Sequence, residues 1–210
     1  MKIVICYVYP VFLPSYDELA HRFVQSYIQH PPGETDHEVH IYANGAHPSK
    51  KQMAIMEPLS PRWHVGGNLG KDIGAYQRAA SEIECDLMLC LGTPVYFRQA
   101  GWLDWITRTY EQNGPGLYGC WGFNEPNPHI RTTAFWLPPM IMASYPSFVS
   151  DKWRYEFEHG HHSILNWSKE LGFPSYMVTW QGAFPQGQWH HVERKNCLML
   201  DQHSDRINLQ

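Results

Sequence analysis

The stretch KIVICYV, Lys2 to Val8, decides the fold class, because a β-branched apolar run of this length fits a buried strand and is too short for a helix. Ser15 and Glu18 have the spacing of a capping box, which predicts a helix from about Asp17 to Gln29. HEVHIY, His37 to Tyr42, alternates polar and apolar residues and predicts a second strand. Strand, helix and strand in this order form a βαβ unit, which implies a parallel sheet with a right-handed crossover.

The rest of the chain predicts further strands and helices, which alternate regularly at first and become irregular in the second half. The predicted strands are Arg62 to Val65, Asp86 to Leu91, Leu117 to Gly122, Ile130 to Leu137, Ser175 to Val178 and Asn196 to Leu200. The predicted helices are one capped by Asp72, one from Trp102 to Tyr110 that ends at Asn113-Gly114, and one from Ser163 to Leu171. No repeat or linker interrupts the pattern, so we predict a single α/β domain over residues 1–210, with a mixed, mostly parallel sheet flanked by helices.

Composition excludes several classes of protein. Sixteen Lys and Arg against twenty Asp and Glu give a net charge of −4, and no basic run exceeds the pair Lys50-Lys51, so nucleic acid is not expected as the main partner. The longest nearly uncharged apolar stretch, Leu87 to Val95, is far shorter than the ~20 residues of a transmembrane helix. Without a transmembrane segment or a signal-peptide pattern, we expect a cytoplasmic protein. The five cysteines have no CxxC spacing, which argues against a disulfide framework and a zinc knuckle. Cys6, Cys90 and Cys197 stand in apolar runs, which predicts buried thiols.

A glycine-rich loop, Gly66 to Gly74, is the most informative stretch for function. Its four glycines allow close approach of a ligand to the backbone, and the helix start that follows favours an anion. Lys71 adds a positive charge, so the loop suits a phosphate or a sugar diphosphate; the alternative is a simple turn in which Asp72 caps the helix. In parallel sheets ligands bind at the carboxyl ends of the strands, here the loops after Val8, Tyr42, Val65 and Leu91.

The segment Asn68 to Tyr76 (NLGKDIGAY) resembles the N-x-G-x-D-I-G-A-[FY] segment of glycosyltransferases of the GT-A fold, specifically the family-2-like and rhamnan-synthesis-type proteins. Supporting landmarks follow in the same order: Ile3 to Tyr9, Ile41 to Gly45, Gly101 to Asp104 (GWLD) and His129 to Phe135. The resemblance covers roughly residues 3 to 205. It implies that residues 1–95 bind a nucleotide sugar and that residues 96–210 receive a hydroxyl-bearing acceptor.

The resemblance also implies which residues form the site. It places the sugar nucleotide on Tyr9, Asn44, Asn68, Gly70, Lys71, Asp72 and Arg131. It nominates Glu158 as the catalytic base, with Glu156 as the neighbour that could be confused with it. His203 is similar to a late histidine that contacts metal or phosphate in this fold, and it is the weakest of these candidates.

The stretch after the predicted central strand departs from the family. Such enzymes carry an Asp-x-Asp motif there for a divalent cation, but Leu91 to Tyr96 contains no acid, and hard cations prefer carboxylate oxygens. Either sugar transfer, inverting by resemblance, proceeds without metal, or the chain is an inactive module that still binds sugar nucleotides. The acceptor is left open among a polysaccharide, a lipid-linked sugar, a protein and a modified nucleobase.

A third hypothesis comes from the histidines. The clusters His159-His161-His162 and His190-His191 suggest zinc, because imidazole is a common zinc ligand. Only His159 and His161 have the spacing of a strand pair of ligands, and a third ligand would have to come from elsewhere. The corresponding function would be a zinc-dependent hydrolase. The alternative is that these histidines bind no resident metal, or that they belong to an acceptor site.

Overall fold

Strand β1 (Ile3–Tyr9) lies in the middle of the molecule, as its uninterrupted apolar sequence predicts. In the computed structural model, which describes residues 1–124, 127–146 and 153–202, all seven of its residues are buried. It pairs in parallel with β2 (Glu38–Asn44) on one side and with β4 (Leu87–Gly92) on the other. A strand with partners on both edges and helices on both faces has no solvent-facing side, which explains why it carries no polar alternation.

The sheet has eight strands in the order β11-β10-β6-β9-β4-β1-β2-β3. The remaining strands of the sheet are β3 (Arg62–Gly66), β6 (Leu117–Gly119), β9 (Ala134–Leu137), β10 (Ser175–Thr179) and β11 (Gly182–Pro185). Two short ribbons, β5 (Tyr96–Phe97) with β12 (Met199–Leu200) and β7 (Gly122–Phe123) with β8 (His129–Ile130), lie outside it. The predicted mixed, mostly parallel sheet flanked by helices is therefore confirmed.

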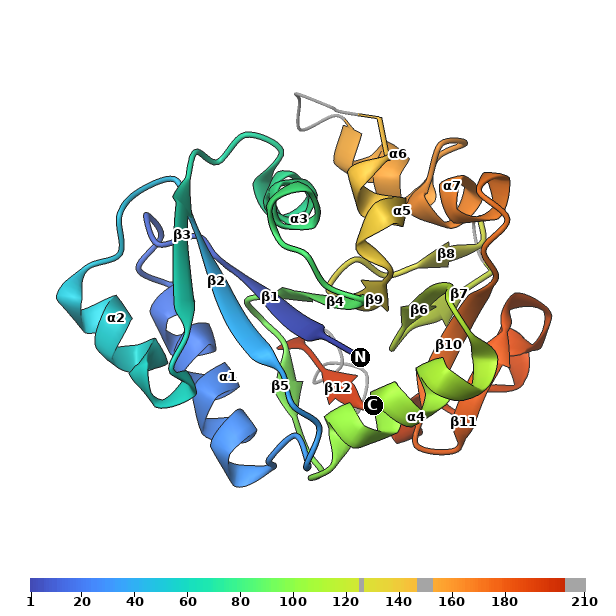
Figure 1. Cartoon of the computed structure of the whole chain (residues 1–210), viewed down its shortest axis with the longest axis horizontal. Helices are drawn as coiled ribbons and strands as arrows, with labels where there is room; N and C mark the ends of the chain where they lie inside the picture. Colours follow the sequence, from blue (N-terminus) through green and yellow to red (C-terminus); the bar gives the residue numbers. More distant parts are fainter. Residues whose placement is uncertain (125–126, 147–152, 203–210) are drawn as a thin grey trace.

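Helices cover both faces of the sheet. Figure 1 shows α3, α5, α6 and α7 above the sheet and α1, α2 and α4 below it. Their bounds are α1 (Tyr16–Gln29), α2 (Lys50–Met56), α3 (Lys71–Glu82), α4 (Trp102–Asn113), α5 (Pro139–Ala143), α6 (Trp153–His159) and α7 (Ile164–Glu170), with 3-10 turns η1 (Glu57–Leu59), η2 (Gln186–His191) and η3 (Arg194–Asn196). Within the described residues, no helix has both the length and the apolar character that crossing a bilayer requires.

The antiparallel strand β9 joins the two halves of the chain. It pairs with β4 on one side and with β6 on the other. Because β9 runs opposite to β4, its first residue, Ala134, lies beside Leu91 near the last residues of β4. The turn that precedes β9 is joined to the end of β4, because the Gly92 amide donates to the Thr133 carbonyl at 2.8 Å. Residues from the second half are thus placed at the carboxyl edge of the first.

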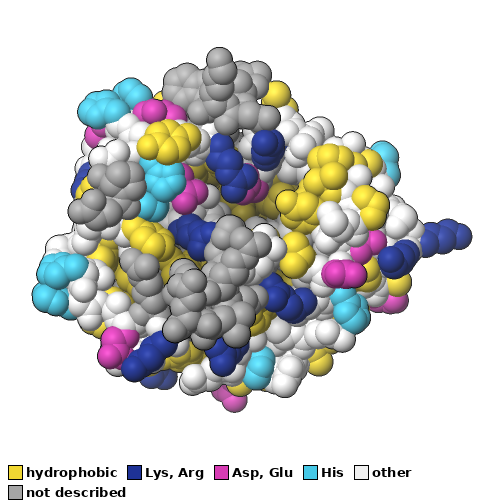
Figure 2. Space-filling view, turned by 180° about the vertical axis from the view of Figure 1, so that it is seen from behind, with side chains coloured by type: hydrophobic (Ala, Val, Ile, Leu, Met, Phe, Trp, Pro, Cys, Tyr) yellow, Lys and Arg dark blue, Asp and Glu magenta, His cyan; other side chains and the backbone are white. Residues whose placement is uncertain are grey.

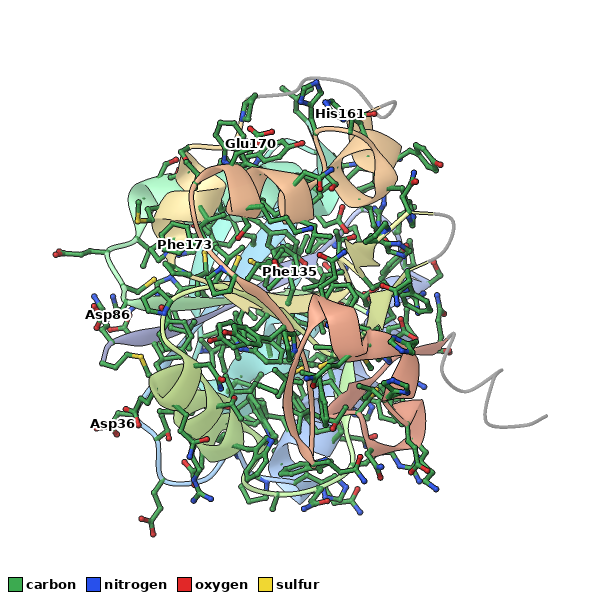
Figure 3. All side chains as sticks on the ribbon, turned by 90° about the vertical axis from the view of Figure 1, so that its right-hand side faces the viewer. Asp36, Asp86, Phe135, His161, Glu170 and Phe173 are labelled. Carbon is green, nitrogen blue, oxygen red and sulfur yellow. The ribbon has the colours of Figure 1, made fainter. Side chains whose placement is uncertain are left out.

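The core is apolar and contains the thiols. Phe135 lies in the interior, whereas Asp36 and Asp86 lie at the surface (Figure 3). Cys6 and Cys90 face each other on neighbouring strands, both fully buried. Burial raises the pKa of both thiols above the usual range, so they remain protonated and packed as small apolar groups. The prediction of buried thiols is confirmed for these residues.

Local predictions fail where tertiary contacts decide. Ser15 has helical φ and ψ, and its side chain makes no cap hydrogen bond; an N-cap residue needs an extended backbone to reach the first turn. The observed capping box is Ser49 with Gln52, at the start of α2, a helix that the sequence analysis did not predict. Asp72 does not cap α3, since Gly70 holds the N-cap position.

Two predicted strands are each divided in the structure. Residues 117–122 form β6 and then β7, and residues 130–137 form β8 and then β9. The turn between β8 and β9 is needed because these strands belong to different sheets. Its residues, Arg131, Thr132 and Thr133, are polar and interrupt the apolar run that the single-strand prediction assumed. The predicted helix at Ser163 is confirmed, with the Ser163 hydroxyl accepting from the Asn166 amide at 3.3 Å.

Candidate active site

A cavity of about 460 Å³ opens at the carboxyl edge of the sheet. Its lining comes from both halves of the chain: Val8, Pro10, Phe12, Leu13, Tyr16, Asn44, Asn68, Lys71, Asp72, Gly92, Thr93 and Pro94 from the first, and Arg131, Thr133, Arg154, Glu158, Asp201 and Gln202 from the second. Figure 2 shows Lys and Arg side chains around a hollow in this face, with hydrophobic side chains beside it. The loops that the sheet topology designates therefore do converge on one cavity.

The loop before α3 is held in an unusual backbone conformation. Gly70 and Lys71 have φ values of 71° and 51°. Glycine adopts a positive φ freely, but for Lys71, which has a Cβ, this conformation costs free energy. The Asn44 side-chain amide donates to the Lys71 carbonyl at 2.9 Å. A Cβ on Gly74 would lie 2.2 Å from the Leu69 carbonyl oxygen, so the loop can pack on the helix only because residue 74 is glycine. The loop thereby holds the exposed Lys71 side chain at the cavity.

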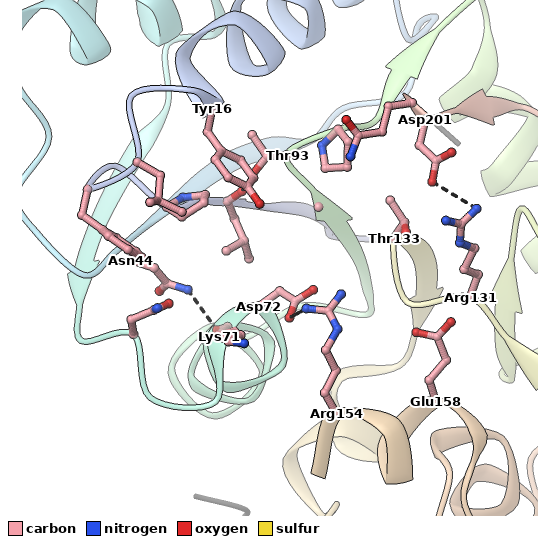
Figure 4. Close-up of a pocket in the computed structure, with 18 residues that line it drawn as sticks. Tyr16, Asn44, Lys71, Asp72, Thr93, Arg131, Thr133, Arg154, Glu158 and Asp201 are labelled. Carbon is pink, nitrogen blue, oxygen red and sulfur yellow. Dashed lines mark hydrogen bonds and ion pairs between the residues drawn. The ribbon is translucent and has the colours of Figure 1, made fainter. Parts of the chain in front are cut away.

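Among the described residues, three cations line the cavity, and two of them pair with acids that line it as well. Arg154 lies 2.9 Å from Asp72, and Arg131 lies 3.3 Å from the fully buried Asp201 (Figure 4). Burial raises the pKa of the Asp72 carboxyl, an effect that the nearby Arg154 guanidinium opposes. Together with Lys71, the arginines offer donors for an anionic ligand of the size of a diphosphate.

Glu158 reaches the cavity from α6. One carboxylate oxygen accepts from the Thr132 hydroxyl at 2.6 Å, and the other lies 3.6 Å from the His159 imidazole Nε2. The side chain is 15% exposed, enough to meet a ligand in the cavity. Glu156 turns elsewhere, because its carboxylate accepts from the His162 amide at 2.8 Å. Of the two neighbouring acids, the structure thus brings Glu158 and not Glu156 to the cavity.

Most of the predicted site residues meet in this cavity: Asn44, Asn68, Lys71, Asp72, Arg131 and Glu158 line it. Tyr9 does not, because side chains alternate along a strand and those of Val8 and Pro10 take the cavity side. Tyr9 is fully buried, and its hydroxyl donates to Asp17 at 2.6 Å. Gly70 supplies the turn without lining the cavity, and His203 lies outside the described residues.

The sequence analysis missed Arg154 and Asp201, both charged residues of the cavity. Arg154 precedes Glu158 by four residues, a spacing that places both on one face of a helix. Predicting α6 would have found it, but the sequence analysis predicts no helix over Trp153–His159. Asp201 stands two positions before His203, and nothing local indicates that it is buried against Arg131.

The residues at the end of β4 do not fit a hard divalent cation. Gly92, Thr93 and Pro94 provide no carboxylate, and the Thr93 hydroxyl donates to the Val8 carbonyl at 2.6 Å. Two acids of the cavity, Asp72 and Asp201, already face arginines. No reaction step is therefore assigned to a cation at this edge.

Comparison with solved structures finds glycosyltransferases. The mannosyltransferase PcManGT from Pyrobaculum calidifontis, in complex with GDP-Man and Mn²⁺, aligns with a TM-score of 0.59 and 9% identity over 88% of this chain and 56% of that one. TarS 1–349 from S. aureus aligns with a TM-score of 0.53 and 12% identity over 79% of this chain and 56% of that one. This chain therefore spans little more than half of either protein.

Sequence comparison adds no closer relative. No family model matches the chain, and neither does any curated protein. The structural likeness, at this low identity, shows that the fold is that of the GT-A glycosyltransferases. The finer resemblance to family-2-like and rhamnan-synthesis-type proteins stays a prediction.

Proposed function

We propose that this chain is a glycosyltransferase, which moves a sugar from a nucleotide-sugar donor to a hydroxyl group of an acceptor. One observation supports this most: in a fold shared with glycosyltransferases, three cations and the carboxylate of Glu158 converge on one cavity at the carboxyl edge of the sheet. Cations suit the diphosphate of the donor, and a carboxylate suits the proton of the acceptor.

The donor would lie against the first half of the cavity. The loops after β1 and β2 would hold the nucleoside, with Asn44 and Asn68 in reach of its polar groups. Lys71 and the two arginines would face the diphosphate. Because the cavity is partly enclosed, their charges act in a medium less polar than water and stabilise a departing diphosphate more strongly.

The acceptor would approach from the side of α6. Glu158 would take the proton from the acceptor hydroxyl while the acceptor oxygen forms a bond to the anomeric carbon. The bond from that carbon to the diphosphate oxygen breaks, and the leaving group keeps the electron pair. A single displacement of this kind inverts the configuration of the anomeric carbon. The Thr132 hydroxyl would orient the carboxylate through its 2.6 Å hydrogen bond.

We propose that the cations replace a metal at the leaving group. The support is the set of side chains that line the cavity. The end of β4 offers no carboxylate for a metal, and the cavity offers the cations Lys71, Arg131 and Arg154 instead.

Two variants and one control test the proposal. UDP-, GDP- and dTDP-sugars are titrated onto the protein, and release of nucleoside diphosphate is followed with and without Mn²⁺. We expect Lys71→Ala to weaken donor binding about tenfold or more, since it removes one charge-assisted contact. Glu158→Gln should leave binding intact and lower turnover about 10²- to 10⁴-fold. Glu156→Gln, two residues away and facing the Gly160–His162 turn, is the matched control.

The outcomes separate the hypotheses. Donor binding without turnover under any condition would favour the inactive binding module. Equal losses of binding and turnover in Lys71→Ala and Glu158→Gln would contradict the two roles. No binding of any sugar nucleotide would contradict the transferase itself.

A further inference from the structure

Two histidines and a glutamate form a compact group beside the acceptor end of the cavity. His129, Glu158 and His159 each place one nitrogen or oxygen atom within 4.8 Å of the others. His129 comes from β8, and the other two come from the end of α6. The sequence analysis paired His159 with His161, but His161 is exposed and its ring lies beside His162 instead. The tertiary structure supplies His129 as the partner.

The surroundings of His129 leave one of its nitrogens available for a ligand bond. Its Nδ1 lies 2.8 Å from the Asn127 carbonyl, which can only accept, so Nδ1 carries the proton and Nε2 keeps its lone pair. A histidine that donates its second ring N–H to a backbone carbonyl is the usual arrangement around a bound metal. The ring is 5% exposed and stacks on Phe123, so its orientation is fixed.

His159 carries an unsatisfied nitrogen at the same place. Its Nδ1 is buried and has no hydrogen-bond partner within the described residues, while its Nε2 faces the Glu158 carboxylate at 3.6 Å. Its ring meets that of His129 edge to face, with centroids 4.0 Å apart.

The nearby arginines do not neutralise this group. Arg131 faces Asp201 at 3.3 Å, and Arg154 faces Asp72 at 2.9 Å, so these two ion pairs direct both guanidinium groups to other carboxylates. The Glu158 carboxylate meets the Thr132 hydroxyl and the His159 ring. Glu158 is therefore the acidic member of the group that it forms with His129 and His159.

We propose that His129, Glu158 and His159 bind a zinc ion. Two imidazoles and one carboxylate are a known zinc ligand set, and the fourth position would open towards the cavity that Glu158 lines. Zinc ligand atoms about 2 Å from a tetrahedral ion lie roughly 3.3 Å apart, so the three side chains must close by small rotations when the ion binds. This site does not include the end of β4, where Gly92, Thr93 and Pro94 offer no carboxylate.

The zinc site has a consequence that rests on the proposed transferase function. A carboxylate that binds zinc cannot also take a proton from the acceptor. Zinc at this site and Glu158 acting as the base exclude each other, so zinc should inhibit transfer and a chelator should restore it. The site would then make the reaction sensitive to the zinc concentration.

Metal binding by the whole chain tests the site without any sugar nucleotide. Co²⁺, whose visible absorption reports tetrahedral coordination, is titrated onto the metal-free protein and then displaced with Zn²⁺. We expect a single equivalent of Co²⁺ with tetrahedral absorption, and a loss of affinity of about tenfold or more in His159→Gln and in Glu158→Gln. His161→Gln, an exposed histidine of the same segment, is the matched control and should bind as the unchanged chain does.

The result separates the zinc site from the transferase proposal. The metal affinity of His129→Gln is interpreted only if circular dichroism shows that this variant is folded. If it is not folded, Glu158→Gln and His159→Gln, the two variants in α6, test the site. Binding that is unchanged in His159→Gln, or lost equally in His161→Gln, would overturn the site. Because the titration contains no donor, its failure leaves the transferase proposal intact, and absence of transfer activity leaves the zinc result intact.

Discussion

The two halves of the chain build the same cavity by different means. Residues 1–95 contribute mainly through the ends of parallel strands and one glycine-rich loop, whose backbone is fixed by Asn44 and by close packing at Gly74. Residues 96–202 contribute charged side chains from short elements, and ion pairs and hydrogen bonds over long sequence distances hold them. The first half depends on backbone geometry, and the second depends on pairwise side-chain contacts. Substitutions in the first half should therefore act through backbone packing and strain, and substitutions in the second half through the loss of side-chain pairs.

The largest effect on stability should come from the second half. Arg131→Ala leaves the buried Asp201 without the cation that lies 3.3 Å away. We expect the free energy of unfolding to fall by about 3 kcal/mol, because the guanidinium group that pairs with a buried carboxyl group is removed. Urea unfolding followed by fluorescence measures this. Arg62→Ala, which breaks an exposed pair with Glu38 at the far edge of the sheet, is the control and should leave stability unchanged within error.

A smaller loss should follow from a change in backbone packing in the first half. Gly74→Ala places a Cβ 2.2 Å from the Leu69 carbonyl oxygen, and the loop must move to admit it. We expect about 2 kcal/mol of destabilisation by overpacking, together with weaker donor binding because Lys71 is displaced. A Cβ added at Gly67 would have no atom within 4 Å, so Gly67→Ala is the matched control in the same loop. Equal behaviour of the two variants would argue against a fixed loop.

The strain at Lys71 can be separated from its charge. Lys71→Ala and Lys71→Gly both remove the ammonium group, but only glycine accepts a φ of 51° without strain. We expect the glycine variant to be more stable than the alanine variant by about 1 kcal/mol, with equally weak donor binding in both. Thermal unfolding and donor titration of the pair measure the two effects. A more stable alanine variant would show that the loop relaxes when the lysine is removed.

The smallest effect should be a change in the pH dependence of stability. The pKa of His159 in the folded chain lies below its ordinary value of 6.5, because burial and His129 disfavour its charged form. The unfolded chain therefore takes up the proton first, and stability should fall as the pH drops through 6.5 towards the folded pKa. The stability of the His159→Gln variant should fall less steeply with decreasing pH than the stability of the His161→Gln variant. Urea unfolding in the presence of a chelator measures both.

How much of this could be predicted from sequence differs between the same two regions. KIVICYV and NLGKDIGAY carry their structure in consecutive residues, so periodicity and turn chemistry place β1, the glycine-rich loop and Lys71 correctly. The pairing of His129 with His159, or of Arg131 with Asp201, depends on how distant segments pack, and no local pattern encodes it. Even α2 was missed, although its Ser49–Gln52 capping box is visible in the sequence once the right serine is chosen.

The position of β9 has a consequence for how the chain could be divided. β4 is fully apolar and buried, and β9 covers the edge that β1 does not. A polypeptide cut after residue 95 would expose that flat, uncharged edge, which is a ready template for pairing with other chains. We expect such a fragment to aggregate, so residues 1–95 should not fold as an independent unit without β9.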